Sequence, residues 1–316
     1  MSLRVSAGTN SDTGSLEGSP VEGNPIPKGS SSSEPTPEPL DDSQYLTVLQ
    51  TAFPEEELAR NLELGKALKS TLSNIAVLFG PISPAALEAL TKEPPKDVIR
   101  DVLSRLQPVV AYDADPEQPN AKFRLRHATF PEFLVRVDAK RCKSRPYQAG
   151  HPARQHSRLA TRCLEALVTL KKNMCRLPDP TVPKAEVPNL EGLLEENVPE
   201  HVQYACACWA AHLGLGCYMK KKTNTPEFDC YCWDIGKPLE DFSSGSGTPT
   251  KLRAWVETMA YMGRLDTVGE ALCVAQQHVK DGLGYEEVKS QLAATEKLVA
   301  DHYSEIEACP YKIHMV

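Results

Sequence analysis

The chain has 316 residues, ten cysteines and a net charge of −7, from 35 Lys and Arg against 42 Asp and Glu. The acidic balance disfavours general binding to nucleic acids or anionic membranes. The sequence has no run of about 18 apolar residues, so we expect no membrane-spanning helix. The N-terminus lacks the apolar core of a signal peptide, so we expect a cytoplasmic protein with reduced cysteines.

The first part of the chain, residues 1–42, is rich in Ser, Gly, Pro and Glu, as in Lys28–Pro39. Such a segment has too little apolar surface to offset the entropy lost on ordering. We therefore expect a disordered tail ahead of the folded chain.

The next part, residues 43–145, predicts helices followed by a β-hairpin. A leucine-rich helix around Leu58–Ile75 is expected to end at Gly80-Pro81, and Ser83 followed by a proline predicts the N-cap of a short helix. A third helix is predicted over Pro95–Leu106. Strands are predicted at residues 109–112 and 123–127, with a turn between them. This order is typical of a winged-helix domain.

The hydrophobic period changes within residues 123–134. Phe123 and His127 alternate with arginines, which predicts a half-buried strand, and the spacing then becomes helical. Thr129 and Glu132 match a capping box. His127 lies on the inward face of the predicted strand, so we interpret it first as a structural histidine.

The remaining part, residues 146–316, predicts an irregular stack of helices with no strict repeat. The overall fold class is therefore mostly α. The predicted helices cover His156–Arg176, Pro199–Leu213, Leu252–Met262, Leu265–His278 and Tyr285–Ile306.

A basic stretch runs from Arg136 to Arg158, beside the predicted winged helix. A DNA-reading helix would be expected to carry a basic face, but the helix over Pro95–Leu106 mixes acidic and basic residues. The sequence therefore predicts no nucleic-acid partner.

One cluster of cysteine and histidine residues is a candidate metal site. Zinc prefers four soft ligands, but structural zinc sites generally use Cys-x₂-Cys, and residues two apart on a helix do not share a face. Buried free cysteines are also common in cores, so the sequence predicts no metal, with zinc binding as the alternative. The candidate ligands are Cys206, Cys208, His212, Cys217, Cys230 and Cys232.

No catalytic signature is found in the sequence. There is no Gly-x-Ser-x-Gly elbow and no Gly-x-Gly-x-x-Gly, and Gly65-Lys66 lacks the rest of a phosphate-binding loop. We expect neither an enzyme nor a bound cofactor.

Several motifs in a fixed order carry a resemblance to a known family. The chain resembles the region after the nucleotide-binding core in fungal NACHT-type NOD-like proteins, over about residues 55–316. The motifs are His127–Leu134, Leu159–Leu164, Lys172–Leu177, Gln203–Leu213, Leu252–Glu257 and Ile306–Tyr311.

The resemblance implies a winged helix and a helical domain without the ATPase core that would precede them or the repeats that would follow. It places His127 where the family has a histidine that approaches the nucleotide phosphate. It also implies a non-catalytic regulatory module that binds an intact NACHT-type ATPase. The alternatives are a zinc-binding protein or enzyme that uses Cys206–Cys232, and a degenerate fragment without activity.

Overall fold

The computed structural model describes residues 40–113, 118, 120–136, 146–218, 235–243, 250–278 and 285–316, without the side chains of Cys217, Tyr218 and Thr250. All of these residues belong to one unit, Pro37–Val316. The expected tail, residues 1–42, lies almost entirely outside the described residues. The predicted boundary near residue 145 stays a prediction.

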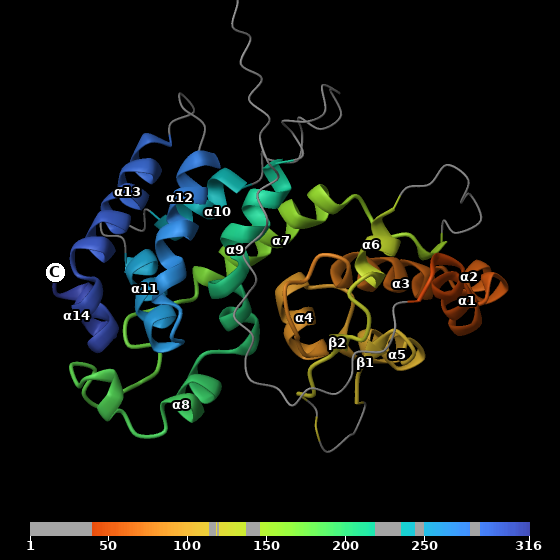
Figure 1. Cartoon of the computed structure of the whole chain (residues 1–316), viewed down its shortest axis with the longest axis horizontal. Coiled ribbons are helices and arrows are strands. Elements are labelled where there is room, and N and C mark those ends of the chain that lie inside the picture. Colours follow the sequence, from red (N-terminus) through yellow and green to blue (C-terminus); the bar gives the residue numbers. More distant parts are fainter. Residues whose placement is uncertain are drawn as a thin grey trace, which may run out of the picture. The chain divides into compact units, whose positions relative to one another are not determined.

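The described chain is mostly helical, with one small antiparallel sheet (Figure 1). None of the described helices is long and apolar enough to cross a membrane. The elements of the first part are α1 (Asp42–Ala52), α2 (Glu55–Arg60), α3 (Leu62–Ile75), α4 (Pro84–Thr91), α5 (Lys96–Arg105), β1 (Val110–Ala111), β2 (Arg124–Leu125) and α6 (Phe130–Val135).

The sheet is shorter than predicted. Strands β1 and β2 pair Val110 with Leu125 and Ala111 with Arg124, and a single antiparallel bridge joins Ile82 to Phe123. The predicted alternation is nevertheless present, because Phe123 and His127 are buried while the arginines between them are exposed.

The regular elements described in the second part are all helices. These are α7 (Pro152–Leu167), η2 (Lys184–Glu186), α8 (Leu190–Asn197), α9 (Glu200–Tyr218), α10 (Gly236–Ser243), α11 (Thr250–Tyr261), η7 (Leu265–Thr267), α12 (Val268–His278), α13 (Glu286–Asp301), α14 (Tyr303–Ala308) and η8 (Pro310–His314).

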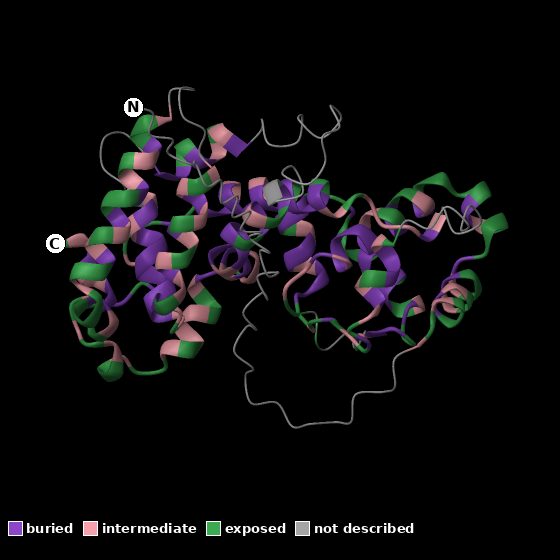
Figure 2. Ribbon diagram, turned by 45° about the horizontal axis from the view of Figure 1, so that its top comes forward, coloured by how far each residue is buried: buried purple, intermediate pink, exposed green. Residues whose placement is uncertain are grey.

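The core of this part contains a cluster of three aromatic side chains. Trp209 on α9, Trp255 on α11 and Phe242 on α10 pack edge to face with ring centroids 5.4–6.0 Å apart. The indole of Trp255 also donates to the carbonyl of Cys206 at 3.0 Å, which satisfies its N–H inside the core. Figure 2 shows buried residues along the faces that these helices turn toward one another.

Helices α7 and α9 approach each other closely. A Cβ atom on Gly216 would lie 2.5 Å from the Ser157 hydroxyl and 2.9 Å from its backbone nitrogen. Only glycine leaves room for the backbone of the facing helix at that distance.

Two predicted helices are interrupted. The helix expected around Leu58–Ile75 breaks at Asn61, whose side chain accepts a hydrogen bond from the Leu64 amide and caps α3. The helix expected over Tyr285–Ile306 breaks at His302 into α13 and α14.

The helix expected over His156–Arg176 ends much earlier, at Leu167. Asn173 and Arg176 have positive φ angles of 54° and 55°, which a right-handed helix cannot include. The Asn173 side chain bonds both backbone groups of Leu177, so it stabilises a turn where hydrophobic spacing alone predicted helix.

The predicted caps had different outcomes. Ser83 caps α4 by accepting from the Ala86 amide at 3.1 Å, as predicted. The prediction of a capping box at Thr129 and Glu132 is wrong, because the Thr129 side chain makes no capping hydrogen bond. Its hydroxyl bonds the hydroxyl of Tyr45, 84 residues away, at 2.8 Å instead.

Candidate functional site

His127 follows β2 and packs its ring edge to face against Tyr45 of α1, with centroids 6.0 Å apart. The side chain is buried, and its Nδ1 has no hydrogen-bond partner among the described residues. The neighbouring Tyr45–Thr129 hydrogen bond ties α1 to the turn that carries His127. The ring of His127 is therefore fixed by packing against Tyr45, while its Nδ1 atom has no hydrogen-bond partner among the described residues.

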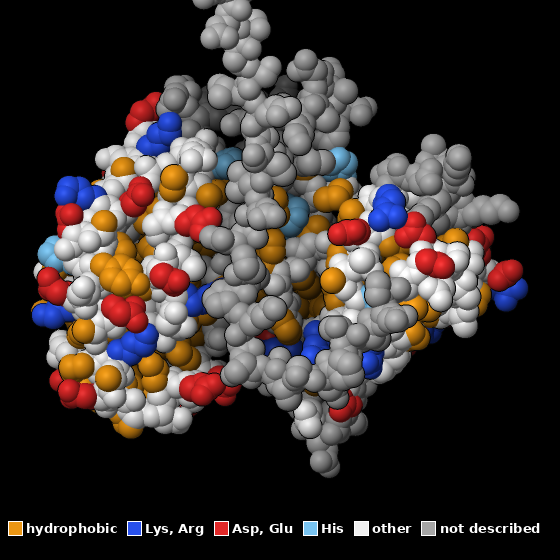
Figure 3. All heavy atoms as spheres, viewed as in Figure 1, with side chains coloured by type: hydrophobic (Ala, Val, Ile, Leu, Met, Phe, Trp, Pro, Cys, Tyr) orange, Lys and Arg blue, Asp and Glu red, His pale blue; other side chains and the backbone are white. Residues whose placement is uncertain are grey.

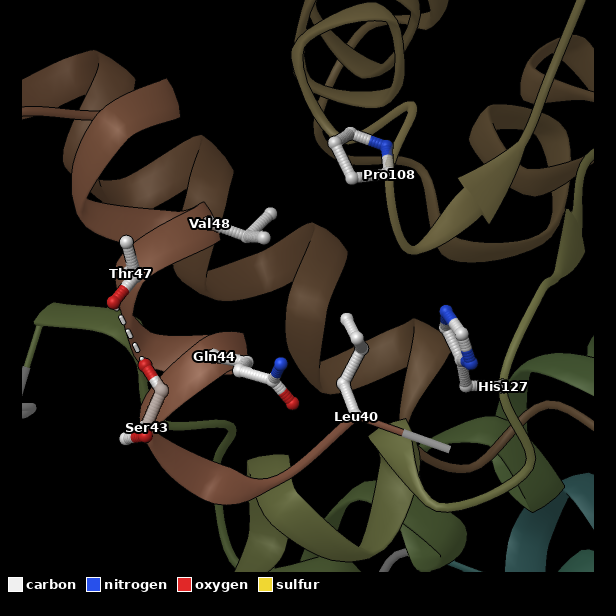
Figure 4. A pocket seen from close by; sticks show the side chains of 7 residues that line it. All are labelled: Leu40, Ser43, Gln44, Thr47, Val48, Pro108 and His127. Atoms are coloured by element: carbon white, nitrogen blue, oxygen red, sulfur yellow. Dashed lines mark hydrogen bonds between the residues drawn. The ribbon is translucent and has the colours of Figure 1, made fainter. Parts of the chain in front are cut away.

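His127 also lines an open pocket of about 540 Å³ on the surface of α1 (Figure 4). In this view the α1 side chains form one side of the pocket, and His127 and Pro108 lie opposite. The lining residues are Leu40, Ser43, Gln44, Thr47, Val48, Pro108 and His127.

The polar side chains that α1 contributes to this pocket form hydrogen bonds within α1 and with its N-cap, Asp41. The Thr47 hydroxyl donates to the Ser43 carbonyl, the Ser43 hydroxyl donates to Asp41, and the Gln44 side chain accepts from the Asp41 amide. A general base would need a hydrogen bond to a nucleophile or an orienting carboxylate. His127 shows neither among the described residues.

The candidate zinc ligands do not form a described metal site. No group of three or more His, Cys, Asp or Glu side chains within the described residues is placed to hold a metal. Burial raises the pKa of the Cys208 thiol to about 12 and raises that of Cys206 further, so both thiols are protonated at pH 7 in the metal-free chain. The Cys217 side chain, Cys230 and Cys232 lie outside the described residues.

His212 instead belongs to a chain of buried polar groups that the sequence did not predict. Its Nδ1 lies 2.8 Å from Nδ1 of His156 on α7, and its Nε2 lies 2.9 Å from the Tyr204 hydroxyl. The amide of Phe79, in the loop between α3 and α4, donates to the same hydroxyl at 3.4 Å. We call Phe79, Tyr204, His212 and His156 the junction chain, because they join this loop to α7 and α9.

The junction chain is uncharged. His212 is fully buried and His156 and Tyr204 are 9% exposed. Burial lowers the pKa of His156 to about 4 and lowers that of His212 well below its ordinary value, with a further contribution from His156. Burial likewise raises the pKa of Tyr204. Both imidazoles are therefore neutral at pH 7.

The spacing of Tyr204, Cys208 and His212 places them on one face of α9, which is a signal that the sequence contains. The partner His156 carries no such signal, because it lies 56 residues from His212. The sequence grouped His212 with cysteines, whereas the structure pairs it with a histidine on the adjacent helix.

A second buried polar group lies near the end of the chain. The Oε2 atom of Glu257 accepts from the Asn173 amide at 3.1 Å and lies 2.8 Å from Nε2 of His314. Its Oε1 and the hydroxyl of Tyr261, one turn along α11, have no partner among the described residues. We call Glu257, His314, Asn173 and Tyr261 the C-terminal cluster.

The C-terminal cluster is surrounded by contacts that fix η8 on α11. The Arg253 guanidinium donates to the carbonyls of Ile313 and Val316, and Lys172 lies 4.4 Å from the centre of the Tyr311 ring. Burial, assisted by the Glu257 charge, raises the pKa of the nearby Cys175 thiol to about 12. These contacts are consistent with a structural role for the cluster.

Three comparisons with known proteins gave no match. No protein-family model matches the chain, and neither the curated proteins nor the solved structures contain a significant match to it.

Proposed function

We propose that the chain is a non-catalytic interaction module, built from a winged helix and a helical stack, that binds an intact NACHT-type ATPase. The observation that carries the proposal is the open pocket between α1 and His127. Its lining combines apolar side chains, such as Leu40, Val48 and Pro108, with the polar side chains of α1 and His127. This composition suits a protein side chain inserted from a partner.

The order of the first elements supports the winged-helix part of the proposal. Helix α3 is followed by the bridge at Ile82, then by α4 and α5, and then by β1 and β2. Because Ile82 pairs with Phe123 in an isolated bridge, the segment before α4 lies beside the chain at the start of β2, where a winged helix has its first strand. Helix, strand, two helices and two strands is the element order of a winged helix.

The distribution of charge is compatible with a protein partner. The face shown in Figure 3 has acidic and basic side chains interspersed over the described residues, without a continuous basic area. Two arginines of the predicted winged helix are paired with acidic residues, Arg136 with Asp42 and Arg105 with Glu57. Phosphate-binding surfaces keep such cations available.

The test uses the tagged full-length chain, purified from its own cells, with its partners identified by mass spectrometry. We expect recovery of a protein that carries a NACHT nucleotide-binding core, and direct binding when the two purified proteins are mixed. Recovery of no such ATPase, or no direct binding, would overturn the proposed function.

The pocket itself is tested with two variants of α1. Thr47→Arg fills the pocket from an exposed position, whereas Gln50→Arg adds the same charge at an exposed position of α1 outside the pocket lining. We expect Thr47→Arg to weaken binding to the ATPase at least about tenfold, which corresponds to one or more interface contacts. Gln50→Arg should bind as the unchanged chain does, and equal loss in both variants would exclude this pocket as the contact.

A further inference from the structure

The ring of His127 is a polar part of the α1 pocket that forms no hydrogen bond. The side chain is only 6% exposed, and neither ring nitrogen has a hydrogen-bond partner among the described residues. Nδ1 is fully buried, whereas Nε2 is not, so a molecule in the pocket reaches the ring at Nε2. Figure 4 shows the ring opposite the side chains of α1.

The polar side chains on the α1 side of the pocket already form hydrogen bonds. The Thr47 hydroxyl donates to the Ser43 carbonyl, and Ser43 and Gln44 bond to Asp41 through their side chains. His127 is therefore the lining side chain whose hydrogen-bonding groups are left for a ligand within the described residues.

The chemistry of imidazole selects a hydroxyl as the best partner for Nε2 of His127. A neutral imidazole carries its proton on one nitrogen only, so Nε2 is a donor in one tautomer and an acceptor in the other. A hydroxyl can donate and accept, and it therefore fits both tautomers. A carbonyl oxygen can only accept and an amide N–H can only donate, so each fits one tautomer alone.

The apolar part of the lining selects the size of the group that carries the hydroxyl. Leu40, Val48 and Pro108 contribute apolar surface to a pocket of about 540 Å³. Among side chains with a hydroxyl, those of serine and threonine are too small to cover this surface. Tyrosine brings an aromatic ring and loses little conformational entropy when it is held.

The lining does not fit a phosphate group. It contains neither lysine nor arginine, and the Asp41 carboxylate already accepts from the Ser43 and Gln44 amides at the start of α1. An anion at a helix N-terminus needs such amides to be available. The nucleotide phosphate that the family resemblance places near His127 would also meet the negative charge of Asp41.

The neighbouring parts of this chain do not supply the tyrosine. Residues 1–39, which lead to the pocket residue Leu40, contain no tyrosine. The tyrosines described before α7 are Tyr45, Tyr112 and Tyr147, and all three are buried. A tyrosine that enters the pocket therefore comes from a more distant source.

We propose that the α1 pocket binds a tyrosine side chain of the protein partner, with its ring against Leu40, Val48 and Pro108 and its hydroxyl on Nε2 of His127. The identity of the partner as a NACHT-type ATPase rests on the proposed function. His127 is then the residue of the pocket that distinguishes tyrosine from phenylalanine.

The test uses the full-length chain without the ATPase and 4-methylphenol as the probe, because this molecule is the side chain of tyrosine. Toluene is the matched probe that lacks the hydroxyl. Binding is followed through the NMR signals of the Val48 methyl groups and the His127 ring. We expect 4-methylphenol to bind about fivefold more tightly than toluene, which is the usual net effect of one hydrogen bond.

Two sets of variants locate the probe. His127→Phe keeps a ring to pack against Tyr45 but has no nitrogen, so the preference for 4-methylphenol over toluene should disappear. Thr47→Arg should weaken the binding of both probes, whereas Gln50→Arg should leave both unchanged. This second pair changes exposed positions only and does not depend on the stability of the His127 variant.

Several results would overturn the assignment of the pocket to a partner's tyrosine. Equal binding of the two probes, or a preference that persists in His127→Phe, would exclude the hydrogen bond to His127. Shifts of the Val48 and His127 signals by ADP would indicate a phosphate site instead. Tyr303 is 40% exposed, so probe binding that weakens as the chain is concentrated and recovers in Tyr303→Ser would identify a second copy of this chain as the occupant.

The outcomes for this site and for the proposed function are separate. If 4-methylphenol does not bind but the ATPase is recovered, the tyrosine assignment fails and the proposed function stands. If the probe binds but no ATPase is recovered, the proposed function fails and the phenol site stands. When the purified ATPase binds the chain, it should displace 4-methylphenol, and a complex that still binds the probe in this pocket would overturn the assignment.

Discussion

The junction chain and the C-terminal cluster are both groups of buried polar side chains that include histidine, but they differ in how the buried polar atoms are satisfied. In the junction chain the side chains are neutral, and each group is hydrogen-bonded to the next. In the C-terminal cluster a carboxylate is buried, and one of its oxygens and a tyrosine hydroxyl lack partners within the described residues. The hydrogen bonds of the junction chain join neutral groups. The C-terminal cluster depends on the Glu257 carboxylate, which has a hydrogen-bond partner at only one of its two oxygens among the described residues.

The largest expected effect comes from removing that charge. Glu257→Ala leaves the His314 ring and the Asn173 amide buried without their acceptor, so the free energy of unfolding should fall by about 3–5 kcal/mol. Urea denaturation measures the change. The exposed Glu287 on α13 provides the control, since Glu287→Ala should stay within about 0.5 kcal/mol of the unchanged chain. A small effect of Glu257→Ala would show that the cluster contributes little stability.

A smaller loss is expected from the middle of the junction chain. His212→Leu removes the partner of both His156 and Tyr204, and we expect the free energy of unfolding to fall by about 2–4 kcal/mol at pH 7. The same urea experiment at pH 5 should give a smaller difference, because the unchanged chain has by then lost part of its own stabilisation. An equal difference at both pH values would argue against the histidine pair as the titrating element.

The smallest effects come from a matched pair of tyrosines. Tyr204→Phe removes a hydroxyl with two partners and should lower the free energy of unfolding by about 1–2 kcal/mol. Tyr261→Phe removes a buried hydroxyl without a described partner, so the change should lie within about 0.5 kcal/mol of zero or be stabilising. Thermal and urea unfolding of both variants measure the contrast, and equal losses would mean that the two hydroxyls are equally satisfied.

Local sequence signals predicted those parts of the fold that depend on neighbours in the chain. Ser83 before Pro84 predicted a cap that the structure contains, and the alternation around Phe123 predicted the buried and exposed positions of the strand. Thr129 had an equally good local pattern, but a hydroxyl 84 residues away competes successfully for its side chain. A capping motif is reliable only where no distant partner reaches it.

Distant contacts also limit what the sequence could predict of the junction chain and the C-terminal cluster. Helical spacing on α9 groups Tyr204 with His212, yet nothing in the sequence indicates that the Phe79 amide and His156 complete the chain. The turn at Asn173 that brings an amide to Glu257 was hidden by apolar residues with helical spacing. Contacts between residues far apart in the sequence determine both the junction chain and the turn at Asn173, and the hydrophobic period alone does not predict such contacts.

The histidine pair of the junction chain depends on Gly216, although this residue is not part of the chain of hydrogen bonds. It lies one turn after His212 on α9 and faces Ser157, the residue next to His156, at a distance that excludes a side chain. The absence of a Cβ atom therefore sets how near the two imidazoles can come. Among descendants or relatives of this chain, position 216 and the two histidine positions should vary together: a larger residue at 216 would be found where the histidine pair has been replaced.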